Sequence, residues 1–134
     1  QIIFSAKTRL GHYFRFKDSV SSLCRSFVLY SFKCNKCNLI YYGKTFRHFK
    51  VRAFEHLGLS LRTGKNFTYN PKNNNNTNVL NHLHSCKCKV DISNFSIIGS
   101  ASNDYHLRIK ESLIILRDKP ALNKSSQSIP LALF

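Results

Sequence analysis

Acidic residues are scarce in this chain of 134 residues. Asp and Glu number 6 against 21 Lys and Arg, which leaves a formal net charge of +15 and a pI near 10. This imbalance predicts a polyanionic partner, most simply nucleic acid, held through neutralised phosphates and released counterions. An anionic membrane surface is the weaker alternative, because the basic residues are spread along the chain rather than gathered on one amphipathic helix.

Long hydrophobic runs are also missing. No apolar segment approaches the roughly 20 residues that span a bilayer, which argues against a transmembrane helix. No signal peptide is apparent and the chain begins at Gln1, so we expect a piece of a longer protein. The apolar content of 43%, with 11 Phe, argues against disorder, and the length predicts one domain with a modest core.

Cysteine is present, but its spacing is poor for disulfides. The five cysteines form two close pairs, Cys34-x-x-Cys37 and Cys86-x-Cys88, and a singleton. His82 stands beside the second pair, so the pattern favours a metal site over a disulfide framework. Because disulfides are rare inside cells, an intracellular compartment follows.

A tetrahedral zinc ion takes four such ligands. The set that we expect consists of Cys34, Cys37, His82 and Cys86. His82 and Cys86 are one helical turn apart, so both can face one ion, whereas His84 would face away and Cys88 is the nearest substitute. Four protein ligands would fill the coordination sphere, so the ion would be structural. The alternatives are unrelated free cysteines, or a redox pair at 34–37 that lacks the usual βαβ setting.

Apolar periodicity and turn residues predict the secondary structure. We expect strands at 26–33, 39–42 and 94–99, and helices at 46–57, 79–85 and 104–117. The first two strands would form an antiparallel hairpin that turns at the Cys-x-x-Cys. Thr45, Thr77, and either Asn103 or Asp104 are the expected helix N-caps.

Two of the expected helices carry candidate functional side chains. Arg52 and His56 lie four residues apart, beside the apolar stripe of the first helix, so both can face the hairpin. The alternatives are a solvated charge for Arg52 and a surface histidine for His56. On the last helix Glu111 falls among apolar residues, a costly placement that a divalent cation would offset. A salt bridge to one of the many basic residues is the equal alternative for Glu111.

Three segments lie outside this framework. Residues 1–25 form a basic and aromatic N-terminal arm, in which Arg15 and Lys17 alternate with aromatic residues that suit phosphates and base faces. A surface arm packed on the domain is the alternative. Residues 58–77 form a polar, Asn-rich connection, and residues 125–134 form a tail that would add a short strand or fray.

The order of these motifs resembles the GIY-YIG endonuclease domain. The residues that carry the resemblance are Tyr30, Tyr41-Tyr42-Gly43, Arg52-x-x-Glu55-His56, Glu111 and Asn123. The inserted Cys34-x-x-Cys37, the His82/Cys86 cluster, Lys110-Glu111-Ser112-Leu113 and Lys119-Pro120-Ala121-Leu122-Asn123 make it similar to the endonuclease of Penelope-like retroelements. The chain departs from the family at Val28-Leu29-Tyr30, which lacks the glycine and isoleucine, and at Tyr42, which replaces an isoleucine.

The resemblance implies a small α/β domain over residues 26–124, a three-stranded antiparallel sheet flanked by helices with an inserted zinc-binding knuckle. It implies metal-assisted hydrolysis of a DNA phosphodiester, in which Glu111 holds Mg2+ or Mn2+ and Arg52 neutralises charge on the phosphoryl oxygens.

The resemblance leaves the general base open. Tyr41, with Tyr30 beside it, or His56 would deprotonate the attacking water. Asn123 would orient the substrate or the base. The basic residues expected to contact DNA are Arg15, Lys17, Lys44, Arg47 and Lys50.

In such retroelements the nuclease lies downstream of a reverse transcriptase, and its nick supplies the 3′ hydroxyl that primes reverse transcription. The resemblance thus implies a reverse transcriptase on the same polypeptide, the element's RNA as a further partner, no membrane and a nuclear location. The alternative function is a catalytically inactive, zinc-stabilised nucleic-acid-binding module. Glu111 separates the two, because a carboxylate that faces phosphates repels them in a module that only binds.

Overall fold

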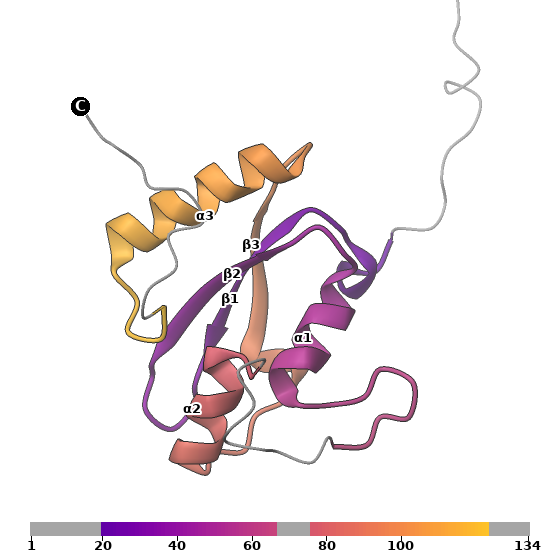
Figure 1. Ribbon diagram of the computed structural model, residues 1–134, viewed down its shortest axis with the longest axis vertical. Coiled ribbons are helices and arrows are strands. Elements are labelled where there is room, and N and C mark those ends of the chain that lie inside the picture. The colour runs from indigo at the N-terminus through magenta and orange to yellow at the C-terminus, as the bar shows by residue number, and fades with distance from the viewer. Residues whose placement is uncertain (1–19, 67–75, 124–134) are drawn as a thin grey trace, which may run out of the picture.

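The computed structural model describes residues 20–66 and 76–123. Within these ranges three strands form one antiparallel sheet in the order β2-β1-β3, accompanied by three α-helices (Figure 1). The strands are β1 (Val28–Lys33), β2 (Ile40–Thr45) and β3 (Phe95–Ser100), and the helices are α1 (Phe49–Leu57), α2 (Asn78–Cys86) and α3 (Asp104–Asp118). The expected small α/β fold is confirmed. The expectations for the N-terminal arm up to residue 19 and for the tail after residue 123 lie outside the described residues.

The hairpin of β1 and β2 forms around the Cys-x-x-Cys, as predicted. The strands pair from Val28 opposite Thr45 to Lys33 opposite Ile40. The backbone N–H of Asn38 donates to the carbonyl of Cys34 at 2.9 Å and closes the turn. The turn therefore holds the first thiol at the end of a strand.

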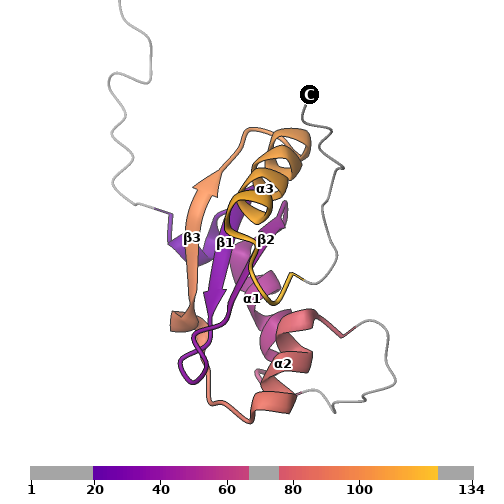
Figure 2. The same ribbon diagram turned by 90° about the vertical axis from the view of Figure 1, so that its left-hand side faces the viewer.

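Helices cover both faces of the sheet. α3 lies on one side of the strands, and α1 and α2 lie on the other (Figures 1 and 2). Alternate residues of β1 pack with α1, α2 and β3 in the main core, which includes Val28, Tyr30, Phe32, Phe49, Ala53, Val79 and Phe95. Leu29 points the other way and is also buried, as expected for a central strand with both faces covered. No helix among the described residues is both long and apolar enough to cross a membrane.

The first helix begins later than the sequence predicts. We expected it to start at residue 46 with Thr45 as its cap, but Thr45 is the last residue of β2 and pairs with Val28. The Thr45 hydroxyl accepts from the backbone N–H of Arg47, so it caps a turn between strand and helix instead. His48 is the true N-cap, and Phe46 is left 58% exposed.

The other two helices begin at the caps that the sequence predicts. The Thr77 side chain accepts from the backbone N–H of Leu80 at the start of α2, at 3.1 Å. The Asn103 side chain accepts from the backbone N–H of His106 at the start of α3, at 2.9 Å. Short polar side chains thus fix where both helices start.

Candidate active site and metal centre

Tyr30 lies at the centre of β1 and is fully buried. It sits opposite Gly43 of β2, where a Cβ atom would come within 2.5 Å of the Tyr30 hydroxyl. Glycine therefore leaves the space through which the phenol crosses β2. The ring centroid of Tyr30 is 6.4 Å from that of Tyr41 on the neighbouring strand. The close approach of the Tyr30 hydroxyl to Gly43 gives a physical reason for the glycine of the Tyr41-Tyr42-Gly43 motif.

α1 presents Arg52 and His56 to the hairpin, as their spacing predicts. The Tyr30 hydroxyl lies 2.6 Å from His56 Nε2 and accepts from Arg52 Nε at 3.2 Å. His56 is fully buried, so the alternative of a surface histidine is wrong. The other ring nitrogen, Nδ1, lies 2.9 Å from the Thr77 hydroxyl. Sequence reasoning identified Thr77 as a helix cap but missed this second contact.

Glu55 orients the guanidinium group of Arg52. Arg52 donates from Nη1 to Glu55 Oε2 at 2.9 Å, and Arg47 contacts the same carboxylate at 2.8 Å. Arg52 is thus fixed on two sides, by Glu55 and by the phenol of Tyr30. Sequence reasoning gave Glu55 no role, although its place three residues after Arg52 on a helix could have indicated the ion pair.

Glu111 is buried on α3, with 7% of its surface exposed. Leu107 and Ile115, one turn before and after it, are buried as well. The carboxylate lies close enough to Tyr30 and Tyr41 to raise the pKa of both phenols, in addition to the larger effect of burial. The Glu111 carboxylate therefore lies within electrostatic range of the two phenols of the hairpin.

These five residues, Tyr30, Tyr41, Arg52, His56 and Glu111, are called the tyrosine cluster below. Burial and then the nearby Arg52 lower the pKa of His56 well below its usual value, so the imidazole is neutral at pH 7. Tyr41 is 9% exposed, whereas Tyr30 and His56 have no exposed surface. Tyr41 is thus the member of these three that solvent or a ligand can reach.

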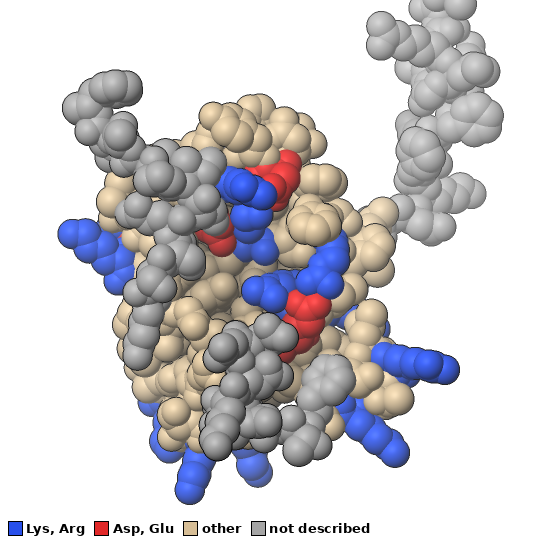
Figure 3. Space-filling view, viewed as in Figure 1, with Lys and Arg blue, Asp and Glu red and all other residues tan. Residues whose placement is uncertain are grey.

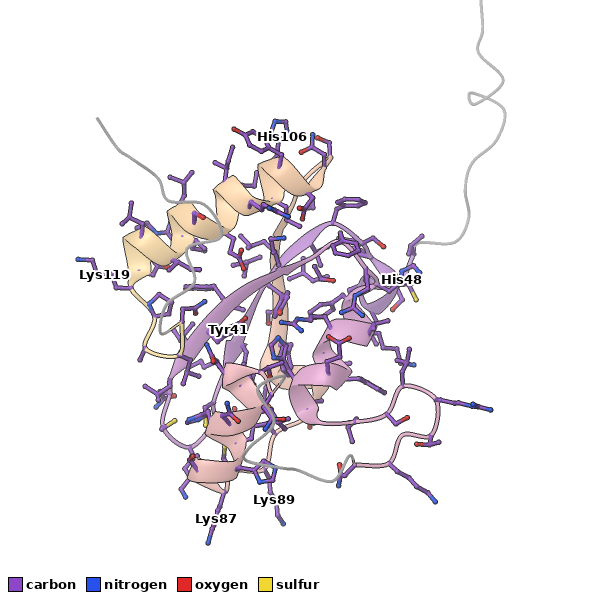
Figure 4. All side chains as sticks on the ribbon, viewed as in Figure 1. Tyr41, His48, Lys87, Lys89, His106 and Lys119 are labelled. Carbon is purple, nitrogen blue, oxygen red and sulfur yellow. The ribbon has the colours of Figure 1, made fainter. Side chains whose placement is uncertain are left out.

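The tyrosine cluster opens on one face of the molecule. Figure 3 shows acidic and basic side chains side by side around a hollow on this face, between α3 and α1. Figure 4 shows Tyr41 on β2 in the middle of the same face. Lys87 and Lys89 point outward at the far end of α2, away from this hollow (Figure 4). Charges of both signs therefore lie on the face that carries Tyr41.

Asn123 holds the strand that carries Tyr41. Its side-chain oxygen accepts from the Tyr42 N–H at 2.9 Å, and its side-chain nitrogen donates to the Tyr42 carbonyl at 2.7 Å. Both polar groups of the amide are thus engaged with β2. The Asn123 amide thus fixes the backbone of β2 at Tyr42, and its expected role in orienting the substrate or the base stays a prediction.

The basic residues expected to bind DNA have different surroundings. Lys44 forms an ion pair with Asp104 of α3 at 2.8 Å, and Arg47 forms one with Glu55. Lys50 is exposed, and its ammonium group lies 5.4 Å from the centre of the Phe54 ring. Arg15 and Lys17 lie outside the described residues. DNA contact by these residues stays a prediction.

The second candidate site is a metal-ligand set at the turn of the hairpin. Its four ligand atoms lie within 4.8 Å of one another and belong to Cys34, His82, Cys86 and Cys88. This set is called the cysteine cluster below. It contains Cys88 where we expected Cys37, although Cys37 Sγ lies only 3.3 Å from His82 Nε2. His84 is exposed and outside the set, as predicted.

The end of α2 explains why Cys88 enters the cluster. Lys87 adopts the left-handed conformation, with φ of 48°, and ends the helix. The chain reverses there, so Cys88 returns to within 3.4 Å of Cys34, measured between the sulfur atoms. A helical wheel places His82 and Cys86 correctly but carries no information on a residue beyond the helix end.

The donor set of the cysteine cluster fits zinc. Three thiols and one imidazole are a usual structural zinc set, and its ligand atoms lie roughly 3.3–3.8 Å apart around a tetrahedral ion. Burial opposes ionisation of Cys34, but hydrogen bonds with His82 and with the backbone of Cys37 and Lys36 lower its pKa to about 6. One thiol is therefore ready to bind as a thiolate at neutral pH.

Comparisons with models of known protein families, with curated proteins and with solved structures find no match. The two clusters and the charge of the chain are therefore the features that bear on function.

Proposed function

We propose that this domain is a metal-dependent DNA endonuclease of the GIY-YIG type. The position of Glu111 carries the proposal. It is one of two glutamates in a chain with a net charge of +15. It is buried on α3, yet its carboxylate acts electrostatically on Tyr30 and Tyr41, the phenols of the facing hairpin.

A carboxylate in this setting favours a nuclease over a protein that only binds DNA. Alone it would repel the phosphates that the basic chain attracts. Magnesium is commonly bound by one or two carboxylates together with substrate phosphates, so Glu111 would hold Mg2+ or Mn2+ against the DNA backbone. When bound, the cation would supply Lewis-acid stabilisation of charge on the phosphate and the leaving oxygen.

The remaining members of the tyrosine cluster take roles that follow from exposure. Arg52 is partly exposed and held rigidly by Glu55 and Tyr30, so its guanidinium group would neutralise charge that builds up on the phosphoryl oxygens. Tyr41 would position the attacking water and accept its proton, since it is the most accessible of the three candidate groups. Tyr30 and His56 would act through Tyr41 as buried positioning residues.

The phenol of Tyr41 must lose its proton to act as a base. Burial and Glu111 raise its pKa, whereas Arg52 and a hydrogen bond with Tyr30 lower it. A cation held by Glu111 would offset the effect of that carboxylate. Nicking is therefore expected to need the cation for the ionisation of Tyr41 as well as for the phosphate.

The cysteine cluster would hold a structural zinc ion that joins the hairpin turn to α2. The charge of the chain and the similarity of its motifs to Penelope-like retroelements support a wider proposal. The domain would nick chromosomal DNA in the nucleus to supply a 3′ hydroxyl for a reverse transcriptase on the same polypeptide, with the element's RNA as a further partner.

A plasmid assay tests the nuclease proposal. Supercoiled DNA is incubated with Mg2+ and the wild-type chain, Glu111→Gln or Asp118→Asn. The control removes one acid from the same helix, at its exposed end. We expect nicking by the wild type and by the control, and a loss of at least about 10³-fold in Glu111→Gln. DNA binding should be unchanged or tighter in that variant, because a negative charge is removed.

Two results would contradict the proposal. Equal nicking by Glu111→Gln and the wild type would exclude Glu111 as the metal ligand. Tight DNA binding without nicking by any of the three proteins, at any divalent cation, would leave a zinc-stabilised binding module.

A further inference from the structure

Acidic side chains are unevenly distributed over the described residues. Except for Asp91, every acidic residue that the structure describes lies on α1 or α3, the two helices that contribute to the tyrosine cluster. There the acids pair with nearby basic residues. The pairs are Arg47 and Arg52 with Glu55, Lys44 and Arg108 with Asp104, and Arg117 with Asp118. Much of the positive charge around the tyrosine cluster is therefore neutralised within the protein.

Four exposed lysines lie beside the cysteine cluster instead. Two of them are within two residues of Cys34 in the hairpin turn, and the other two flank Cys88 after α2. Because Cys34 Sγ and Cys88 Sγ are 3.4 Å apart, both pairs of lysines belong to one end of the molecule. The four are called the lysine group below, and they are Lys33, Lys36, Lys87 and Lys89.

The lysine group lacks acidic partners. No ion pair between described residues involves any of its members. Asp91, the nearest acid in sequence, accepts from the backbone N–H of Ser93 at 2.7 Å and caps the turn before β3. Lys87 and Lys89 point outward at the far end of α2 (Figure 4). A zinc ion with three thiolates and one imidazole would carry one net negative charge, which four ammonium groups outnumber. This end of the molecule therefore keeps a positive surface.

The composition of this surface indicates which polyanion it fits. Lysine ammonium groups neutralise phosphates as point charges and carry no information on base sequence. Single-stranded nucleic acids are commonly bound with aromatic side chains on which the bases stack. The exposed Phe and Tyr side chains that the structure describes are Phe27, Phe46 and Tyr105, and none lies on α2 or in the hairpin turn. Lysines without such a stacking surface fit the phosphate backbone of a duplex.

We propose that the lysine group binds the phosphate backbone of duplex DNA to one side of the cleaved bond, and so anchors the DNA that the tyrosine cluster cuts. Tyr30 and Lys33 are three residues apart on β1. Three residues of a strand span about 10 Å, which is about three phosphates along one DNA strand. A duplex that lies along the hairpin can therefore reach both places. The choice of the cut DNA as partner rests on the proposed function, whereas phosphate binding by the lysine group does not.

Two variants test the charge of the lysine group. The first is Lys33→Gln/Lys87→Gln/Lys89→Gln, called the glutamine variant. It keeps Lys36, because the ammonium group of that residue donates to the Cys86 carbonyl at 2.9 Å. The second has arginine at the same three positions and keeps the charge. Zinc content equal to that of the wild type would show that the cysteine cluster is intact in both.

A control variant removes the same charge from other surfaces. It is Arg25→Gln/Lys110→Gln/Lys119→Gln, at exposed positions before β1, on α3 and directly after α3. Lys87 and Lys119 both adopt the left-handed conformation, so the glutamine variant and the control each change one residue of this kind. The two proteins have equal net charge and differ in where the charge is lost.

Fluorescence anisotropy of a labelled DNA duplex measures binding. It is recorded over a range of salt concentrations with zinc-loaded protein and without Mg2+, so that the DNA is not cut. We expect the glutamine variant to lose at least about tenfold in affinity, and the slope of log affinity against log salt to fall by about two to three. The control and the arginine variant should stay within about threefold of the wild type. In the plasmid assay the glutamine variant should have a higher KM and an unchanged kcat, because the tyrosine cluster keeps its contacts.

Two results would overturn the inference. Equal losses in the glutamine variant and the control would show that total charge governs binding, wherever it lies. A loss seen with single-stranded DNA or RNA but not with the duplex would assign the lysine group to another nucleic acid. A wild type that does not nick would instead contradict the nuclease proposal, and the anisotropy result would still decide whether the lysine group binds duplex DNA.

Discussion

The tyrosine cluster and the cysteine cluster share the β1–β2 hairpin but are stabilised in different ways. In the tyrosine cluster the polar groups satisfy one another, since Tyr30 contacts both His56 and Arg52 by hydrogen bonds inside the core. In the cysteine cluster the neighbours of Cys34 are other thiols and an imidazole, which are weak or competing partners. The fold preorganises the first cluster, whereas the proposed zinc ion would stabilise the second.

One helix connects the two clusters. Thr77 at the start of α2 contacts His56 of the tyrosine cluster, and His82 and Cys86 in its last turns belong to the cysteine cluster. A helix of nine residues is too short to be stable alone, so its position depends on packing and, with the proposed zinc ion bound, on the metal as well. The difference between the clusters therefore predicts that the metal supports the geometry of the other site from a distance.

Removal of zinc should have the largest effect on stability. A strong chelator, or Cys34→Ser, would remove the ion that the turn of the hairpin and the end of α2 would both bind. We expect the free energy of unfolding, measured with urea in excess zinc or in chelator, to fall by several kcal/mol. Nicking should fall as well, because Thr77 moves with α2.

Cys24→Ser is the matched control for this experiment. Cys24 is an exposed cysteine outside the cysteine cluster, so the same substitution should leave both stability and zinc content unchanged. Zinc content near one ion per chain in Cys24→Ser and near zero in Cys34→Ser would assign the zinc ion to the cysteine cluster. Equal stability with and without chelator would show that the cluster does not organise the fold.

Arg52→Lys should have the next largest effect, on catalysis. Arg52 contacts Tyr30 through Nε and Glu55 through Nη1 at once, and a lysine ammonium cannot reproduce this planar fork. We expect nicking to fall by about 10²–10³-fold, equivalent to about 2.7–4 kcal/mol of transition-state stabilisation. Arg117→Lys, at the exposed end of α3, should nick like the wild type in the same plasmid assay. If both variants are equally active, only the charge of Arg52 matters, and its rigid placement does not.

The tyrosine cluster was predicted more completely from sequence than the cysteine cluster. Arg52 and His56 share one helix face by simple periodicity, and the apolar neighbours of Glu111 indicated an inward carboxylate. Local patterns are sufficient for such residues because the helix sets their relative direction. Thr77 was found only as a cap, since its contact with His56 depends on how α2 packs against α1.

The errors in prediction occur where elements end. Thr45 looked like a helix cap, but pairing with Val28 extends β2 through it. Cys88 belongs to the cysteine cluster because Lys87 adopts a left-handed backbone conformation and reverses the chain. The periodicity of the sequence does not predict that conformation. In each case a contact distant in sequence decided the outcome.

Gly43→Ala should disturb the tyrosine cluster by a smaller amount. The added methyl group would meet the Tyr30 hydroxyl at 2.5 Å, so the phenol must move away from β2. Overpacking of this kind costs about 1–3 kcal/mol in the free energy of unfolding. Nicking should fall as well, because the phenol of Tyr30 is displaced from Tyr41. Gly99→Ala is the matched control in the same sheet, where the nearest atom would be 3.9 Å away. Equal effects of the two substitutions in urea unfolding would mean that the space at Gly43 is not specific to Tyr30.

The smallest effect is the pH dependence that His56 adds to stability. Burial and Arg52 lower the pKa of His56 in the folded chain, whereas the unfolded chain has a value near 6.5. Between these two values the unfolded state binds more protons, so stability rises with pH up to about 6.5 and gains nothing from His56 above it. One proton limits the slope to about 1.4 kcal/mol per pH unit.

Urea unfolding from pH 5 to pH 8, in excess zinc, isolates this contribution as the difference between the wild type and His56→Gln. The glutamine cannot titrate, so the slope below pH 6.5 should be shallower by the amount that His56 supplies. His106→Gln, which removes an exposed histidine of α3, should keep the wild-type slope. A wild-type slope in His56→Gln would mean that the imidazole titrates normally in the folded state, and a neutral ring held between Thr77 and Tyr30 would then be excluded.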